Sequence, residues 1–129
     1  MREILFRGKR ADNGQWVEGM LDGGNGQYLI NCRTYSVYSN GYWVYKVDAK
    51  TVGQYTGLTD RNGKNVFEGD IVNIIFDDGA RHKACVVVFH NGGFCVKWGK
   101  AYISLQKNIV YEFELIGNIH DNQELLKEK

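Results

Sequence analysis

Tight-turn dipeptides recur along this 129-residue chain and constrain its fold more than any other feature. A type I′ hairpin turn needs positive φ at both central residues, which Asn, Asp and Gly reach at low cost. The chain contains 16 glycines and no proline, so its turns must use this chemistry. The dipeptides lie between short runs rich in Val, Ile, Tyr, Phe and Trp, at Asn13-Gly14, Asn40-Gly41, Asn62-Gly63, Asp78-Gly79 and Asn91-Gly92. This pattern predicts a mostly β protein built from antiparallel hairpins.

The bulk composition indicates one domain, residues 1–129, with a core of its own. A hydrophobic fraction of 43% is enough for a core without disulfides or metals. The formal net charge of +1 disfavours a strongly electrostatic nucleic-acid binder. The three cysteines show no CxxC spacing, which disfavours a secreted disulfide framework. The apolar run Ile4 to Phe6 is too short for a signal peptide, and no run reaches membrane-spanning length. We therefore expect a cytoplasmic protein with no membrane partner.

Three hairpin registers follow from the turns. A two-residue turn at Asn91-Gly92 pairs Phe89 with Phe94, Val87 with Val96 and Cys85 with Trp98, all on one face. A turn at Asn13-Gly14 pairs Ala11 with Trp16 and Lys9 with Glu18. A turn at Asp78-Gly79 places Ile71 and Ile75 with Ala84 and Val86, and the strand Ile71–Phe76 is expected to be buried on both sides.

The C-terminus shows the one helix signal in the chain. Asp121 or Asn122 is suited to cap a short helix that runs through Lys127 and docks Leu125 and Leu126. The loop Asp22 to Gln27 and the corner Asn65 to Gly69 suggest a division into lobes 1–65 and 66–129. The predicted fold is therefore two small lobes of curved antiparallel hairpins that share one body, with a short C-terminal helix.

The segment TVGQYTGLTDRNGKNVFEGDIV, Thr51 to Val72, and the later IGNIHDNQELL closely resemble the YopX family of phage and prophage proteins. The opening MREILFRGKRADNGQWVEG also resembles the start of that family. The resemblance implies a small, predominantly β protein encoded by a bacteriophage or prophage, and hence a location in the cytoplasm of the bacterial host. It brings no established biochemical function and no assigned catalytic residues.

Motifs for catalysis or metal binding are weak. His82, His90 and His120 show no usual metal-ligand spacing with the cysteines, so we expect no metal site and no cofactor. Asp70 follows Gly69 at a corner where its carboxylate can accept backbone N–H bonds. TGLTDRNG lacks the GxxxxGK of a phosphate-binding loop. We therefore expect no catalytic residues and a protein that is not an enzyme, with a hydrolase at Glu68 and Asp70 as a distant alternative.

The aromatic run YSVYSNGYWVY, Tyr35 to Tyr45, is the strongest functional signal. A turn at Asn40-Gly41 places Tyr38 opposite Trp43 and Ser36 opposite Tyr45, with Val37 and Val44 on the other face. If the valine face packs inward, the aromatic face forms an exposed strip. The alternative is that these aromatics pack on the other lobe or on a second copy of the protein. The candidate binding surface comprises Arg33, Tyr38, Tyr42, Trp43, Tyr45 and Lys46.

The sequence favours a phage accessory protein that works by binding another protein or itself. The alternative is a protein that binds single-stranded nucleic acid. It would use the aromatic hairpin together with a basic N-terminal strand that carries Arg2, Arg7, Lys9 and Arg10. The same basic residues are more usually just the solvated side of an edge strand.

Overall fold

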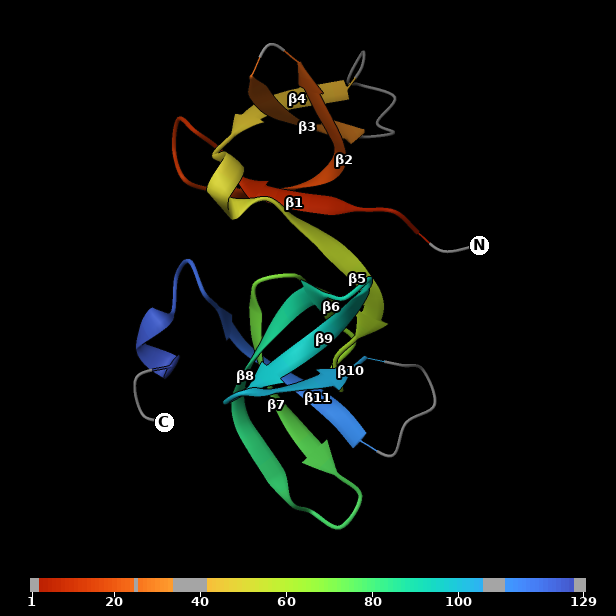
Figure 1. Cartoon of the computed structure of the whole chain (residues 1–129). Helices are drawn as coiled ribbons and strands as arrows, with labels where there is room; N and C mark the ends of the chain where they lie inside the picture. Colours follow the sequence, from red (N-terminus) through yellow and green to blue (C-terminus); the bar gives the residue numbers. More distant parts are fainter. Residues whose placement is uncertain (1–2, 25, 34–41, 106–110, 127–129) are drawn as a thin grey trace. The chain divides into compact units, whose positions relative to one another are not determined.

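A computed structural model describes residues 3–24, 26–33, 42–105 and 111–126, and at Arg33, Tyr42 and Trp43 it describes the backbone. The chain divides into two compact units, Met1–Tyr55 and Thr56–Lys129 (Figure 1). We call them unit 1 and unit 2. Both are mostly β with antiparallel pairing, as the turn dipeptides predict.

The described residues of unit 1 form four strands and the beginning of a fifth. Their order is β4-β3-β2-β1-β5, and a 3-10 turn, η1 (Ala49–Thr51), connects β4 to β5. Strand β2 pairs with β1 through residues 16–19 and with β3 through residues 20–24, so it passes from one partner to the other at Gly19. The strands are β1 (Phe6–Lys9), β2 (Trp16–Gly24), β3 (Gln27–Arg33), β4 (Tyr42–Val47) and β5 (Gly53–Thr59).

Two glycines let the backbones of unit 1 approach closely. A Cβ placed on Gly19 would lie 2.1 Å from the backbone oxygen of Asn31, and one on Gly8 would lie 3.0 Å from Val47 Cβ. Val47 and Ile30 are both buried and form the centre of this unit. The small residues therefore allow β2 to bend at Gly19 and the strands to close over Ile30.

Unit 2 contains the rest of β5, which pairs with the short β6 (Asn65–Phe67), and a five-stranded sheet in the order β10-β9-β8-β7-β11. Tyr111 Oη on one edge strand donates to the Ser104 oxygen on the other at 2.8 Å, which links the two edges of that sheet. The sheet strands are β7 (Asp70–Phe76), β8 (Arg81–His90), β9 (Gly93–Trp98), β10 (Ala101–Ser104) and β11 (Tyr111–Asn118).

The core of unit 2 lies on one face of the five-stranded sheet. Its buried residues come from β6, β7, β8, β9 and β11 and are Val66, Val72, Ile74, Cys85, Val87, Val96 and Phe113. Ile71 and Val72 are adjacent in β7 and neither is exposed to solvent. Because adjacent residues of a strand point to opposite faces, β7 is buried on both sides at Ile71 and Val72. Asn73, Ile75 and Phe76 are half-buried, so the prediction holds only for the start of the strand.

The hairpin registers depend on how many turn residues adopt positive φ. Asn91 (φ 51°) and Gly92 (φ 85°) both do, and the predicted pairs Phe89–Phe94 and Val87–Val96 are confirmed. The described pairing of β8 with β9 begins at Val86–Lys97, and Trp98 pairs instead with Ala101 of β10. The register is therefore the predicted one, but the ladder stops before the predicted pair Cys85–Trp98.

At Asn13-Gly14, only the glycine has positive φ, 73°. The loop is longer than predicted, and Lys9 pairs with Trp16 while Arg7 pairs with Glu18. The predicted pairs Ala11–Trp16 and Lys9–Glu18 are therefore wrong by a shift of register. A single left-handed residue does not form the type I′ turn on which that prediction depended.

At Asp78-Gly79, the glycine again has positive φ alone, 89°. The pair Ile71–Val86 is confirmed, but the register shifts between Val72 and Ile74, so that Ile75 pairs with Arg81. Ala84 takes up the shift with a φ of 55°. Asn73 stabilises this bulge, because its side-chain oxygen accepts the Ala84 N–H at 3.0 Å.

The predicted C-terminal helix is a four-residue 3-10 turn, η2 (Gln123–Leu126). The Asn122 side chain accepts the N–H of Asn118 at 3.1 Å, upstream of the turn, so it does not cap a following helix. Lys127 lies outside the described residues.

Candidate binding surface

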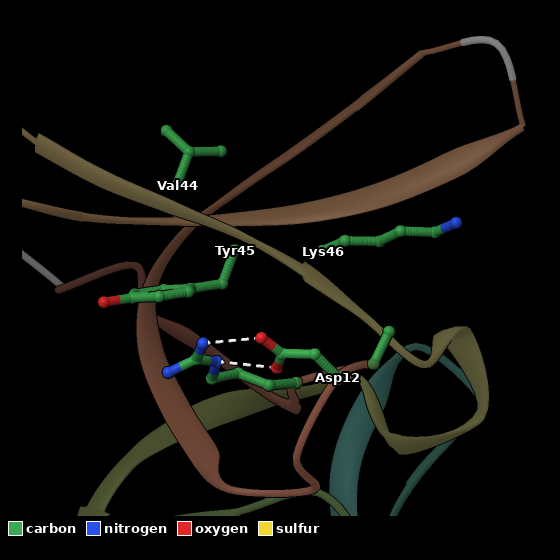
Figure 2. Close-up of a pocket in the computed structure, with 6 residues that line it drawn as sticks. Asp12, Val44, Tyr45 and Lys46 are labelled. Carbon is green, nitrogen blue, oxygen red and sulfur yellow. Dashed lines mark hydrogen bonds and ion pairs between the residues drawn. The ribbon is translucent and has the colours of Figure 1, made fainter.

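A pocket of about 370 Å³ lies in unit 1, where the chain after β1 diverges from β4. Figure 2 shows Val44, Tyr45 and Lys46 on one side of it, along β4, and Asp12 on the other. Its lining residues are Arg10, Ala11, Asp12, Val44, Tyr45 and Lys46. The pocket therefore combines one ion pair, one aromatic ring and aliphatic side chains.

The turn after β1 holds Asp12 next to Arg10. The Arg10 N–H donates to the Gln15 oxygen at 2.8 Å, and the Gly14 N–H donates to the Arg10 oxygen at 2.9 Å. Inside this loop, the Asn13 side chain accepts the Gln15 N–H at 3.0 Å. These bonds fix the backbone of the loop, so that the side chains of Arg10 and Asp12 lie on the same side of it.

Arg10 and Asp12 form a two-pronged ion pair. Arg10 Nε donates to Asp12 Oδ1 at 3.0 Å, and Arg10 Nη2 donates to Asp12 Oδ2 at 2.7 Å. The hydrogen bond to Arg10 holds the pKa of Asp12 below its ordinary value, and the same bond raises the pKa of Arg10. The Arg10 guanidinium carbon also lies 4.3 Å from the centre of the Tyr45 ring. The Arg10 guanidinium group is thus held by the Asp12 carboxylate and by the face of the Tyr45 ring.

The segment after β1 also pairs with the outer edge of β4. The Ala11 N–H donates to the Lys46 oxygen at 2.8 Å, and the Asp48 N–H donates to the Lys9 oxygen at 2.9 Å. Between these two bonds, Arg10 and Val47 form a β-bridge. This short ladder forms one end of the pocket.

The outer face of β2, β3 and β4 adjoins the pocket. Met20, Asn31 and Val44 form one cross-strand row. Asp22, Leu29 and Lys46 form the next row. Met20 and Val44 are exposed by 55% and 44%, which is high for large apolar side chains. We call this surface, Met20, Asp22, Leu29, Asn31, Val44 and Lys46, the β2–β4 outer face.

Val44 and Tyr45 lie the opposite way round from the arrangement of an exposed aromatic strip. Such a strip requires the valine face to pack inward, but Val44 points outward while Tyr45 is half-buried beneath Arg10. The reason is the pairing of Tyr45 with Ile30 and of Val47 with Tyr28, which places the odd residues of β4 on the face of the buried Ile30. At Val44 and Tyr45 the condition for an exposed aromatic strip is therefore not met.

The remaining residues of the predicted surface divide into two groups. Lys46 is exposed and lines the pocket, and the backbones of Tyr42 and Trp43 pair with those of Arg33 and Cys32. Tyr38 and the turn at Asn40-Gly41 lie outside the described residues, as does the expected pairing of Tyr38 with Trp43.

Sequence reasoning missed Asp12 and Met20, and it assigned Arg10 only to a basic strand. The close spacing of Arg10 and Asp12 before the Asn13-Gly14 turn was the available signal, because a loop of this type brings such residues together.

The basic residues of the N-terminal strand lie against aromatic rings. The Arg7 guanidinium carbon is 4.6 Å from the centre of the Trp16 ring, and Lys9 Nζ is 5.5 Å from the same centre. Together with Arg10 over Tyr45, these contacts place three cations beside two rings of unit 1. Such contacts orient the side chains and leave their charge in place.

Two acidic residues of the Thr51–Val72 motif accept hydrogen bonds from backbone N–H groups. Asp70 is buried and its carboxylate accepts the Phe67 N–H at 2.7 Å. Asp60 is 5% exposed and accepts the N–H groups of Asn62, Lys64 and Leu115 at 2.9, 2.9 and 3.1 Å. Burial alone would raise the pKa of Asp60, but these bonds outweigh it and lower the pKa.

Neither a metal-binding cluster nor a membrane helix is found in the described ranges. No three His, Cys, Asp or Glu side chains of these ranges come together so that they could hold a metal ion. Within the same ranges, no helix has the length and apolar character needed to cross a membrane.

Comparisons with known proteins identify the family through a sequence model and support the fold through a solved structure. The sequence model of the YopX protein family matches residues 5–127. Among solved structures, the chain is similar to the crystal structure of protein EF1440 from Enterococcus faecalis, with a TM-score of 0.60 and 24% identity. That match covers 98% of this chain and 100% of the other, and it concerns the fold. The search of curated proteins finds no match. Because the family match covers nearly the whole sequence, this chain belongs to the YopX family.

Proposed function

We propose that this YopX-family protein is a non-enzymatic accessory protein of a bacteriophage or prophage that acts by binding a protein through the β2–β4 outer face and the adjoining pocket. The phage context rests on the family resemblance. The observation that carries the binding proposal is the exposure of Met20 (55%) and Val44 (44%) in one row of paired strands.

Exposed apolar side chains that lie close together on one face of a sheet differ from scattered ones, because a partner can cover them in one contact. Asn31 lies between Met20 and Val44 in the row, and Leu29 lies beside it in the next. Asp22 and Lys46, both exposed, occupy the two ends of the second row. Exposed apolar side chains with charged residues beside them are typical of a protein-binding surface.

The positions of the acidic residues support a non-enzymatic role. The distant hydrolase alternative needs Glu68 and Asp70 as a carboxylate pair in contact with water. Asp70 is 1% exposed and its carboxylate accepts a backbone hydrogen bond, which accounts for it structurally. Asp60, in the same motif, is likewise bound by three backbone N–H groups.

Single-stranded nucleic acid is the second candidate ligand. It is favoured by the cations Arg7, Lys9 and Arg10, which lie within reach of the rings of Trp16 and Tyr45 in one unit. Bases stack on aromatic rings where cations stand nearby. We place this candidate second because these cations already lie over the rings that a base would need.

Recovery of partners from the host tests the protein-binding proposal. The full chain, Met20→Ser and Val44→Ser are each expressed with an affinity tag in phage-infected host cells, cross-linked and purified. We expect specific host or phage proteins to be recovered with the wild-type chain and to be lost with both variants. Ile4→Ser is the matched control, because Ile4 is equally exposed (53%) but lies outside the β2–β4 outer face.

Three results would count against the proposal. Partners that persist in Met20→Ser and Val44→Ser would show that binding does not use this face. Release of all bound material by nuclease, together with a salt-sensitive gel shift that is lost in Trp16→Ala and Tyr45→Ala, would favour nucleic acid. Turnover of a substrate by the purified chain would remove the non-enzymatic part of the proposal. Sedimentation velocity shows whether the bound protein is a second copy of the chain.

A further inference from the structure

The hydrogen bonds on the outer edge of β4 show which of its backbone groups point away from β3. The Lys46 oxygen accepts from Ala11, and the Asp48 N–H donates to Lys9, so residues 46 and 48 direct their backbone groups outward. In a strand, every second residue directs its N–H and C=O to the same side. The backbone groups of Val44 and Tyr42 therefore also point away from β3.

The ladder on this edge stops after Ala11. Beyond that residue, the chain enters the loop in which the Gly14 N–H returns to the Arg10 oxygen. Strand β4 is an edge strand, and no described residue pairs with Val44 on its outer side. The pocket lies at the point where the two chain segments diverge, and Val44 lines it (Figure 2).

We propose that the edge of β4 at Tyr42 and Val44 receives an extended segment of the partner protein, which adds a strand to the sheet and continues the ladder begun by Ala11. This inference rests on the proposed function and names its binding mode. The added segment donates to and accepts from the outward backbone groups of Val44 and Tyr42, which supplies affinity without regard to sequence.

The side chains at the site determine which segment fits. A residue placed opposite Val44 extends the row Met20–Asn31–Val44, so an apolar, preferably β-branched or aromatic side chain is favoured there. The neighbouring side chains of the added strand point to the opposite face, toward the pocket. Arg10 and Asp12 in the pocket already neutralise each other, so this position favours an uncharged side chain.

Backbone-modified peptides test the inference. The probe is a displayed library of random linear peptides, selected on the full-length chain. The tightest binder is then synthesised in two forms, each N-methylated at alternate residues, and its Kd is measured by calorimetry. We expect one alternate set to weaken binding by about tenfold or more and the other set to leave it nearly unchanged, because only every second peptide N–H faces β4.

Amide hydrogen exchange of the wild-type chain provides an independent readout. The Val44 N–H should exchange fast in the free protein and become protected when the peptide binds. Val44→Pro, which removes this N–H but no bond to β3, should abolish peptide binding, whereas Val44→Thr should retain it. If Val44→Pro does not fold, the exchange measurement on the wild-type chain still shows whether the bound peptide pairs with Val44.

The possible failures are distinguishable. Equal tolerance of both N-methylated sets, or protection of the Val44 N–H in the free chain, overturns strand addition. If Met20→Ser still loses the host partner in that case, the proposed function stands. Failure of the library to yield any binder also overturns the inference. A dimer that the selected peptide dissociates would show that the segment comes from a second copy of this chain rather than from another protein.

Discussion

The Asp60 carboxylate accepts the backbone N–H of Leu115 at 3.1 Å and so joins the Asn62-Gly63 turn to strand β11. The neighbouring Arg61 N–H donates to the Phe113 oxygen at 2.8 Å and reinforces the same junction. Asp60 of the Thr51–Val72 motif therefore has a structural role in unit 2. Asp60 binds two N–H groups of its own turn and one from a strand far away in sequence.

Asp60→Asn should destabilise unit 2 by about 2 kcal/mol at neutral pH. An amide has one acceptor oxygen, so its NH₂ group would face one of the three N–H donors of Asn62, Lys64 and Leu115. Urea unfolding followed by circular dichroism measures the change. Asp78→Asn is the control, because Asp78 accepts one bond, from Ala80, in an exposed turn. Equal stability of Asp60→Asn and wild type would show that the carboxylate charge is not needed.

The contribution of Asp60 should also depend on pH. Burial alone would raise its pKa, but the N–H groups of Lys64, Leu115 and Asn62 lower it below the unfolded value. A carboxyl whose pKa is lowered by folding stabilises the protein above its unfolded-state pKa, and this contribution is lost as the pH falls through the folded-state pKa. The stability difference between wild type and Asp60→Asn should therefore shrink in acid. A constant difference across an acid titration would contradict the lowered pKa.

Gly19→Ala should destabilise unit 1 by about 3 kcal/mol, because the added Cβ would lie 2.1 Å from the Asn31 backbone oxygen, where only backbone movement gives room. The thermal midpoint and the exchange rates of the β2 and β3 amides measure the effect. Gly24→Ala is a matched control in the same strand, since nothing lies within 4 Å of its added Cβ. A Gly19→Ala chain with wild-type amide protection would show that β2 can bend without a glycine at this point.

The sequence predicts the strands of this protein better than their register. At Asn91-Gly92 both residues take positive φ, and the register follows from the turn. At Asn13-Gly14 and Asp78-Gly79 only the glycine does, and hydrogen bonds outside the dipeptide decide the pairing. The Asn73 bond to Ala84, for example, stabilises a bulge that no local pattern indicates.

The candidate surface could also be predicted only in part, because its orientation depends on strand pairing. The alternation of β4 is plain in its sequence, but which set of residues faces inward depends on the pairing of Tyr45 with Ile30. Ile30 lies in β3, and β3 pairs with β2 only beyond Gly19, where β2 leaves β1. The inward face of β4 therefore depends on contacts that are distant in the sequence. Lys46 of the predicted binding surface lines the pocket, while Val44 and Tyr45 face opposite to the arrangement that an exposed aromatic strip requires.

Arg10→Gln should raise the pKa of Asp12 toward its ordinary value. The two hydrogen bonds from Arg10 are the main cause of the lowered Asp12 pKa, and glutamine cannot supply the fork or the charge. A carbon-13 NMR titration of the Asp12 carboxyl measures this directly. Lys46→Gln is the control, because Lys46 lines the same pocket without bonding to Asp12. An unchanged Asp12 pKa in Arg10→Gln would mean that the ion pair does not persist in solution.

Asn31→Leu should stabilise unit 1 by about 1 kcal/mol, although it places an apolar side chain on an outer face. The Asn31 side-chain oxygen is shielded from solvent and has no hydrogen-bond partner among the described residues. Leucine has a similar shape and removes this unpaired acceptor, and it joins Met20 and Val44 in a continuous apolar row. Urea unfolding measures the gain, with Asn31→Asp as the contrasting variant, which should be less stable than wild type because it adds a charge at the same shielded position. If Asn31→Leu is instead destabilised, the amide makes a bond in solution that offsets its burial, and the row is less apolar than its exposed side chains indicate.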